Sequence, residues 1–160
     1  MDERKWIERI LAGDTQSFSC LVAKYEKMAY TIALRILENR EEAEEAVQDA
    51  FVKMYRALSD FHFDSKFSTW FYRIVYRTAL TALRQQRMFV SYEEAGPVDL
   101  SNDEVESATA LLEREDRKEM IARTLKKLPA DEALLLTLYY LEECSVEEIC
   151  QITELSASNV

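Results

Sequence analysis

A central stretch of this 160-residue chain combines arginines with aromatic rings, and these two side-chain types hold single-stranded nucleic acids. The stretch reads KFSTWFYRIVYRTALTALRQQR over residues 66–87. Four of its arginines are spaced by 4, 7 and 3 residues, which places them on one face of a helix. Aligned cations repel one another unless an anion lies alongside, so the pattern favours nucleic-acid binding over a solvated helix face. The four are Arg73, Arg77, Arg84 and Arg87.

The segment before this helix adds more rings to the cations. Residues 59–67 read SDFHFDSKF, which lacks helical periodicity and predicts a loop. His62, the single histidine of the chain, lies in this loop, and Trp70 begins the arginine-bearing face. An isolated loop histidine is ordinarily a surface residue, so His62 gains its interest from its neighbours. Rings beside cations are what unstacked bases require.

The charge of the chain is distributed unevenly. Its formal net charge is −10, yet residues 53–87 carry 7 basic and only 2 acidic side chains. Residues 88–160 carry 6 basic and 17 acidic side chains. Because a polyanion responds first to local charge, the basic island favours a nucleic-acid partner despite the acidic total.

A carboxylate-rich helix is predicted directly before this loop. Residues 39–58 read NREEAEEAVQDAFVKMYRAL, with Glu45, Gln48 and Asp49 on one side. A carboxylate-bridged di-metal site would need Glu-x-x-His pairs, and this stretch holds no histidine. Two interpretations stay open here, a solvated face and a docking face for a basic partner helix.

These side chains must be positioned by helices. The chain has two glycines and two prolines, too few for a turn-rich β architecture, and its apolar residues recur with helical spacing. Helices are predicted from about 16 to 37, 40 to 58 and 69 to 87, with a short amphipathic one near Trp6. Asp14 and Asn39 are expected to cap the first two, and Ser68 or Thr69 the third.

Residues 88–108, MFVSYEEAGPVDLSNDEVESA, read as an acidic linker between two domains. Beyond it, helices are predicted at 111–128, 130–143 and 145–153, the last with Ser145 and Glu148 in capping-box spacing. A fourth helix would begin at Ser156, but one turn is unstable by itself, so the natural protein is expected to continue. The expected core residues of this second domain are Leu134, Leu135, Leu136, Leu138, Tyr139, Leu141, Cys144 and Cys150.

The sequence contains no pattern that predicts an enzyme. There is no nucleophile–base pair, no glycine-rich phosphate loop and no metal-ligand cluster, so no catalytic residue, cofactor or metal is expected. The three cysteines do not suggest a disulfide framework. No signal peptide and no apolar run of membrane-spanning length is present, so we expect a cytoplasmic protein without membrane insertion.

Two segments together resemble a known family. The segment AEEAVQDAFVKMYRALSDFHFDSKFSTWFYRIVYRTALTALRQQ resembles region 2 of sigma-70 family RNA polymerase sigma factors. LPADEALLLTLYYLEECSVEEICQITELSASNV resembles region 4, which carries a helix-turn-helix. The likeness is to the small extracytoplasmic-function (ECF) group, which keeps only these two regions. It implies an all-α fold with region 2 at 1–87, a linker at 88–108 and region 4, with an incomplete recognition helix, at 109–160.

The resemblance implies roles for particular residues. In this family the helix carrying EEAVQD docks on the β′ coiled coil of core RNA polymerase, and the next loop and helix bind the melted −10 element with a base flipped out. Arg84 and Arg87 would then hold phosphates without reading sequence. The implied polymerase-binding residues are Glu45, Gln48, Asp49, Phe51, Val52 and Tyr55. The implied −10 residues are Phe61, His62, Asp64, Lys66, Phe67, Ser68, Thr69, Trp70, Arg73 and Arg77.

The chain also departs from the family pattern. Many relatives carry Asn and Asp in an N-x-A-x-D-like part of the third helix, where this chain has Arg77 and Thr81. The implied −35-reading residues, Ser156, Ala157, Ser158 and Asn159, include no basic side chain. Family partners would be core polymerase, through the β′ coiled coil and the β flap, promoter DNA and an anti-sigma factor. The alternative is a helical interaction module or sigma-mimicking regulator that binds polymerase without reading DNA.

Overall fold

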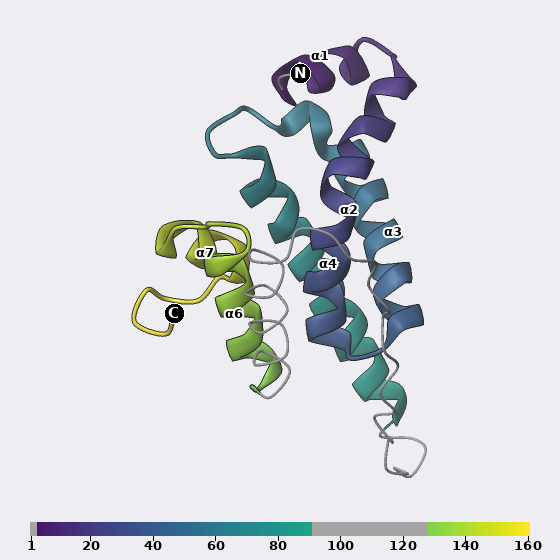
Figure 1. The fold of residues 1–160 in the computed structure, drawn as a ribbon. Coiled ribbons are helices and arrows are strands. Elements are labelled where there is room, and N and C mark those ends of the chain that lie inside the picture. Colours follow the sequence, from purple (N-terminus) through teal and green to yellow (C-terminus); the bar gives the residue numbers. More distant parts are fainter. Residues whose placement is uncertain (1–2, 91–127) are drawn as a thin grey trace, which may run out of the picture.

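The computed structural model describes residues 3–90 and 128–160, and in these ranges the chain forms helices and no strand. The all-α prediction is therefore confirmed. Figure 1 shows the first four α-helices stacked as a bundle, with the last two beside it. The elements are α1 (Glu3–Leu11), α2 (Thr15–Leu37), α3 (Arg40–Ala57), the 3-10 helix η1 (Leu58–Asp60), α4 (Phe67–Val90), α6 (Ala130–Tyr140) and α7 (Val146–Thr153).

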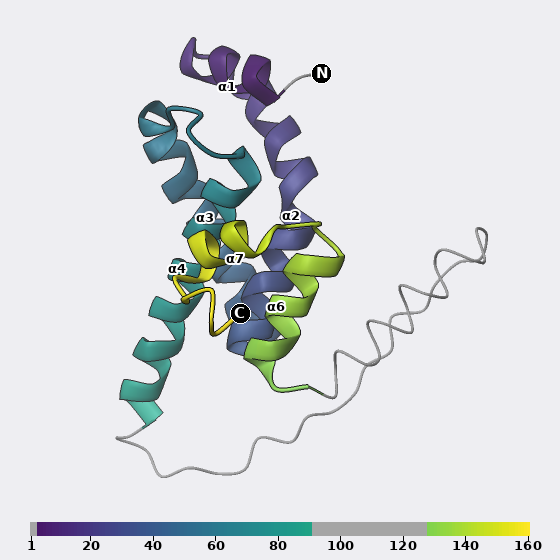
Figure 2. The same cartoon turned by 90° about the vertical axis from the view of Figure 1, so that its left-hand side faces the viewer.

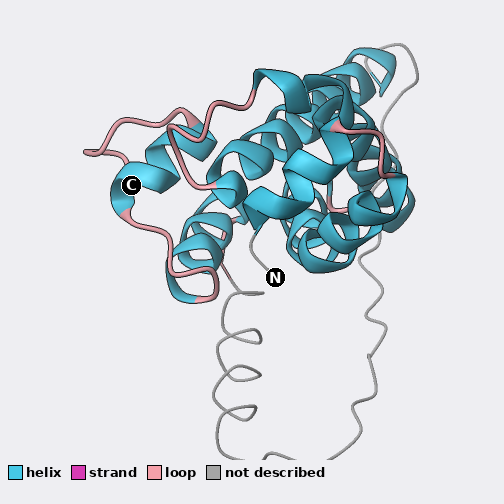
Figure 3. Ribbon diagram, turned by 90° about the horizontal axis from the view of Figure 1, so that it is seen from above, coloured by secondary structure: helices cyan, strands magenta, loops and turns pink. Residues whose placement is uncertain are grey.

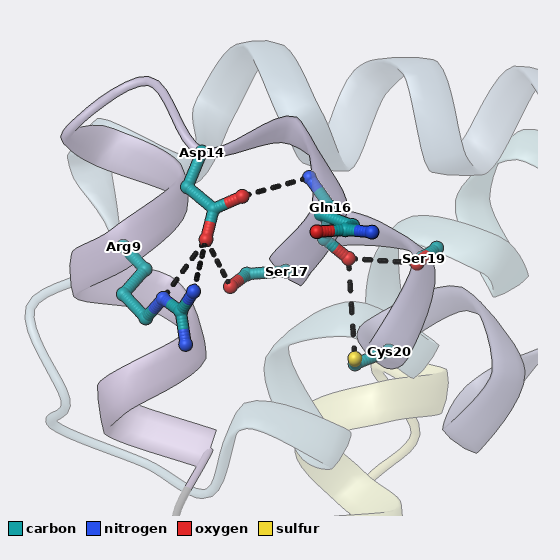
Figure 4. A network of polar contacts seen from close by, with 6 residues as sticks. All are labelled: Arg9, Asp14, Gln16, Ser17, Ser19 and Cys20. Atoms are coloured by element: carbon teal, nitrogen blue, oxygen red, sulfur yellow. Dashed lines mark hydrogen bonds and ion pairs between the residues drawn. The ribbon is translucent and has the colours of Figure 1, made fainter.

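The start of α2 is fixed by Asp14, as the sequence predicts (Figure 4). One carboxylate oxygen of Asp14 accepts a hydrogen bond from the backbone N–H of Gln16 at 3.0 Å, and the other accepts from the Ser17 hydroxyl at 2.9 Å. Arg9 at the end of α1 donates to the second oxygen at 2.8 Å. These contacts, the Ser17 bond foremost, hold the pKa of Asp14 below its usual value. The cap thus also joins α1 to α2.

Two further predicted caps are present. The side chain of Asn39 accepts from the backbone N–H of Glu42 at 3.2 Å and begins α3. Ser145 and Glu148 form a reciprocal capping box at the start of α7. The side chain of each N-cap satisfies a backbone donor that the helix itself leaves without a partner.

The start of α4 differs from the prediction. The helix begins at Phe67, so Ser68 and Thr69 lie inside its first turn and neither is its N-cap. The ring of Phe67 is 3% exposed and lies 5.3 Å from the ring of Tyr25, centroid to centroid. Because this ring is buried, the helix begins before the two hydroxyl-bearing residues that we expected to cap it. Tertiary packing therefore decides where α4 begins, in place of the preference of Ser and Thr for the N-cap position.

A ring-rich core joins α2, α3 and α4. Phe71 of α4 is fully buried, with its ring centroid 4.8 Å from that of Phe51 on α3 and 6.0 Å from that of Tyr25 on α2. The short helix α1 closes one end of the bundle with Ile7 and Ile10, both buried. Each aromatic side chain removes a large apolar area from water, so these contacts set the spacing of the three long helices.

The C-terminal helices pack on the bundle. Helix α7 lies against α4, and α6 lies against α2. Figure 2 shows the two C-terminal helices beside the bundle, and Figure 3 shows the described residues as helices joined by loops. Leu138 and Ile149 are buried in the same apolar cluster as the rings of the bundle. The prediction that Tyr139 is core is wrong, since its side chain is 49% exposed. Of the other predicted core residues, Leu134 and Cys144 are buried, and Leu135, Leu136, Leu141 and Cys150 are half-buried.

The end of the chain is also different from the prediction. Residues 156–159 form a turn, closed by a 2.8 Å hydrogen bond from Asn159 N–H to the Ser156 carbonyl, and not a helix. Helix α4 continues to Val90, three residues past its predicted end. Most of the predicted linker and nearly all of the predicted helix at 111–128 lie outside the described residues. In the described ranges, no helix has the length and apolar character needed to cross a membrane.

Candidate nucleic-acid interface

The predicted arginine face of α4 is present. Its four guanidinium-bearing side chains are exposed, whereas Phe71, Val75 and Thr78 are buried beneath them. The periodicity of the sequence therefore separates the two sides of α4 correctly. We use the term arginine face for Arg73, Arg77, Arg84 and Arg87.

Aromatic residues of the loop and of the first turn of α4 lie next to one another at the N-terminal end of this helix. The Phe61 ring centroid lies 5.0 Å from that of Trp70 and 5.4 Å from that of Phe67. Phe61 and Phe67 are themselves buried, so in this arrangement they support the loop, while His62 and Asp64 are exposed. Other predicted −10 residues divide in the same way: Lys66 is exposed, Ser68 and Trp70 are half-buried, and Thr69 is buried.

A carboxylate from the C-terminal part of the chain lies on the arginine face. Glu154 accepts a 2.9 Å hydrogen bond from Nε of Arg77, and a second contact comes from Nη2 of the same side chain. Nη2 of Arg73 lies 3.6 Å from the same carboxylate oxygen. These contacts, led by the Arg77 hydrogen bond, hold the pKa of Glu154 below its usual value. A carboxylate of the same chain thus contacts two of the four guanidinium groups of the arginine face.

Two more glutamates from the C-terminal part of the chain contact residues at the start of α4 and directly before it. Glu148 lies 2.9 Å from Nζ of Lys66, and this contact lowers the pKa of Glu148 and raises that of Lys66. Glu142 accepts a 2.9 Å hydrogen bond from the Tyr72 hydroxyl, which is part-buried. We call Glu142, Glu148 and Glu154 the acidic clasp.

The acidic clasp leaves the cations accessible. The side chains of Arg73 and Arg77 are 45% and 53% exposed, and that of Lys66 is 67% exposed. Exposed ion pairs gain little free energy, because water screens the charges and ordering long side chains costs entropy. An anion of higher charge density can therefore displace these carboxylates. Guanidinium groups locked in a dry interface would have excluded a nucleic-acid ligand.

The outer face of α3 is open to solvent. Of the six predicted polymerase-binding residues, five are exposed and Phe51 alone is buried. One end of this face borders a shallow, mainly apolar hollow of about 340 Å³ between α2 and α3, which Phe18, Val52 and Tyr55 help to line. We use the term docking face for Glu45, Gln48, Asp49, Val52 and Tyr55.

Sequence reasoning missed the acidic clasp. The opposite charges of the two segments were visible in the sequence, because residues 88–160 hold 17 acidic side chains and the arginines lie in the basic island. Periodicity could not show which carboxylates meet which cations, since Arg77 and Glu154 are 77 positions apart. The predicted −35 residues remain separate from this site, and all of them are exposed in the C-terminal turn.

Comparisons with known proteins agree with this geometry. The model of sigma-70 region 2 matches residues 21–88, and that of sigma-70 region 4 matches residues 118–160. The RNA polymerase sigma-H factor of Pseudomonas aeruginosa is 32% identical over 99% of this chain and 86% of its own length. The ECF RNA polymerase sigma-E factor of Escherichia coli K12 is 30% identical over 96% of this chain and 84% of its own length.

Solved structures show the same fold. An engineered region 2 of sigmaE, in complex with GTAAAA, is 34% identical over 56% of this chain and 94% of its own, with a TM-score of 0.53. The sigma factor RpoE from Bartonella quintana, in complex with the anti-sigma factor NepR, is 16% identical over 90% of this chain and 87% of its own, with a TM-score of 0.71. The two matched regions and the extent of the likeness place this chain in the sigma-70 family of RNA polymerase sigma factors, in its ECF group.

Proposed function

We propose that this chain is a promoter-specificity subunit of RNA polymerase. It binds core polymerase, directs it to promoters, melts the −10 element and so permits transcription to begin. The observation that carries the proposal is the arginine face and its adjoining rings, in the segment that is similar to a sigmaE region 2 bound to GTAAAA. Sigma factors are initiation factors and not enzymes, so the chemistry of transcription belongs to the polymerase.

The docking face is the surface that we assign to core polymerase. Its carboxylates, Glu45 and Asp49, suit a basic partner helix, while Val52 and Tyr55 supply apolar contact area next to the hollow. Tyr55 is 46% exposed and Val52 47%, and both line the same apolar hollow, so together they offer a partner a contiguous apolar contact area. On the family pattern, the β′ coiled coil contacts this face and the β flap contacts region 4.

The arginine face, Lys66 and the loop are the surface that we assign to the −10 element as a melted strand. Arg84 and Arg87 hold phosphates further along the helix, and Ser156–Asn159 is the segment assigned to the −35 element. A cytoplasmic location follows from this role, and an anti-sigma factor is a further partner. In this conformation Glu148 contacts Lys66 and Glu154 contacts Arg77, so the acidic clasp must open before DNA binds.

Reconstitution with core polymerase and open-complex footprinting on a promoter library tests the proposal. Charge reversal at Arg73 and Arg77 should abolish melting and leave the affinity for core polymerase unchanged. Charge reversal at Glu45 and Asp49 should do the opposite. Normal melting by the Arg73→Glu, Arg77→Glu variant would contradict promoter recognition and support a regulator that binds polymerase without reading DNA.

A further inference from the structure

We infer that helix α1 helps to hold the acidic clasp closed through a pair of buried tyrosines. The pair consists of Tyr25 on α2 and Tyr72 on α4, and we call it the tyrosine pair. It gives α1 a regulatory role, whereas the sequence of this helix predicts only packing. The coupling itself can be tested without DNA, and only its consequence for DNA access rests on the proposed function.

The first tyrosine donates to a carboxylate of α1. The Tyr25 hydroxyl oxygen lies 2.5 Å from Oε1 of Glu3, the first residue of this helix, and Tyr25 is 4% exposed. Lys24 contacts the same carboxylate oxygen. Helix α1 is itself anchored on the bundle by Ile7 and Ile10, both buried. A fixed helix therefore presents Glu3 to Tyr25.

The second tyrosine donates to a carboxylate of the acidic clasp. The Tyr72 hydroxyl lies 2.9 Å from Oε2 of Glu142, and Tyr72 is 2% exposed. Glu142 lies in the turn between α6 and α7, two residues before the buried Cys144. A hydroxyl at this depth needs an acceptor, because a buried polar group without a partner costs free energy. The hydrogen bond therefore ties the α6–α7 turn to α4.

The two tyrosines contact each other. Their ring centroids are 5.9 Å apart and their planes are 77° from parallel, which is an edge-to-face arrangement. Burial is the largest cause that raises the pKa of each hydroxyl, and the Glu142 carboxylate contributes to both shifts. Both hydroxyls are therefore protonated donors at neutral pH and lie near the same negative charge. The position of one ring then depends on that of the other.

These contacts connect parts of the molecule that lie apart. Figure 1 shows α1 at the top of the bundle and α7 lower, at its side. Withdrawal of Glu3 leaves the buried hydroxyl of Tyr25 without its acceptor, so Tyr25 shifts and disturbs Tyr72. The hydrogen bond to Glu142 then weakens, and the acidic clasp opens more often. A partner that binds α1 would in this way uncover the arginine face from a distance.

Alkylation of Cys144 in the full chain measures how often the clasp opens. Cys144 is 7% exposed and reacts only when its surroundings open, whereas Cys20 is exposed and serves as the reference for mass spectrometry of the two peptides. Tyr72→Phe should speed alkylation about tenfold, because it removes a hydrogen bond to a carboxylate and keeps the ring. Tyr25→Phe and Glu3→Ala should each speed it by about threefold, because they act through Tyr72.

A double variant and two matched controls test the order of the link. The Glu3→Ala, Tyr72→Phe variant should react about as fast as Tyr72→Phe alone, since the link is already cut, and not at the product of the two increases. Tyr30→Phe removes a hydroxyl from another, half-buried ring of α2. Glu8→Ala removes an exposed carboxylate of α1 that pairs with Arg4. Both controls should leave the rate unchanged.

A core variant separates this coupling from a general loss of stability. Val47→Ala removes buried apolar volume on α3 and should lower the urea midpoint at least as much as Glu3→Ala does, without speeding alkylation of Cys144. If Val47→Ala speeds alkylation as much as Glu3→Ala, general stability explains the effect and the inference is overturned. Increases that multiply in the double variant also overturn it.

A DNA-binding readout distinguishes this inference from the proposed function. By fluorescence anisotropy, Glu3→Ala should tighten binding of a GTAAAA single strand to the free chain about twofold, whereas Arg73→Gln should weaken it. If alkylation responds as expected but neither variant changes DNA binding, the coupling stands and the proposed function is wrong. If Arg73→Gln weakens binding while Glu3→Ala changes neither readout, the proposed function stands and the coupling is wrong. If only the DNA response to Glu3→Ala is missing, the regulatory role of α1 is overturned.

Discussion

The docking face of α3 and the arginine face of α4 belong to one bundle, yet they are presented to solvent in different ways. The docking face is open, with Glu45, Val52 and Tyr55 all exposed. The arginine face carries Glu154 on Arg73 and Arg77. The difference teaches that the two proposed activities have different requirements. If the two faces bind as we propose, core polymerase can bind to this conformation as it stands, whereas DNA must first displace carboxylates of the same chain.

If the arginine face binds DNA as we propose, this contrast explains how an acidic chain can carry a nucleic-acid surface. A free sigma factor with uncovered arginines would bind duplex DNA non-specifically through its phosphates, at many competing sites. The acidic clasp supplies an internal anion that competes with the phosphates. Because its ion pairs are exposed, the competition is weak enough for a promoter strand held by polymerase to prevail.

The largest expected effect comes from the core that both faces share. Phe71 is fully buried and contacts the Phe51 ring beneath the docking face. We expect Phe71→Ala to lower the free energy of unfolding by about 3–5 kcal/mol, because the cavity cannot collapse among packed rings. Urea denaturation measures the loss, and binding of polymerase and of DNA should fail together. If one activity survived at full strength, the two faces would not depend on a common core.

Reversing a charge of the acidic clasp should separate the two faces. Glu154→Lys places a cation beside Arg73 and Arg77, so repulsion replaces attraction. We expect the free chain to bind a GTAAAA single strand about tenfold more tightly, as measured by anisotropy, with no change in its affinity for core polymerase. Glu147→Lys is the control, because it makes the same charge change on an exposed position of α7. Equal gains in both variants would mean that net charge, and not the clasp, governs access.

The individual elements, more than the contacts between them, were predictable from the sequence. Asp14 and Asn39 were recognisable as caps because a cap is a local pattern of a few residues. The arginine face followed from helical periodicity for the same reason. The start of α4 at Phe67 and the exposure of Tyr139 were not predictable, since both depend on which surface packs against which. Glu148 was identified only as a capping residue, and its second role, on Lys66, requires the fold.

A smaller effect is expected from neutralising Glu148. Glu148→Gln keeps the capping box, because an amide oxygen can also accept the Ser145 backbone bond, but it loses the charge that faces Lys66. Burial, with Glu148 and Glu142 nearby, raises the pKa of the Cys144 thiol to about 11, so this thiol reacts slowly with alkylating reagents.

We therefore expect Glu148→Gln to speed alkylation of Cys144 by about threefold at pH 8, since it removes a nearby negative charge and loosens the contact. Mass spectrometry can follow the reaction, with the exposed Cys20 as an internal reference. Glu147→Gln, which keeps both the capping box and the contact with Lys66, should leave the rate unchanged. An equal increase in both variants would show that the effect is not specific to the clasp.

The weakest effect should appear as a pH dependence of the clasp. The pKa values of Glu148 and Glu154 are lowered by Lys66 and Arg77, so protons bind these carboxylates less readily while the contacts are made. Their contribution is therefore complete above the usual glutamate pKa and is lost as the pH falls through the lowered values. Small-angle scattering should show a radius of gyration that rises as the pH is lowered from 7 to well below the usual glutamate pKa, provided circular dichroism shows that the helices persist. The Glu148→Gln, Glu154→Gln double variant should already be expanded at pH 7 and respond less to acid, because the two clasp carboxylates that contact Lys66 and Arg77 are gone. A wild-type chain that keeps its helices and its dimensions in acid would show that apolar packing of α7 on α4, and not the ion pairs, keeps the arginine face covered.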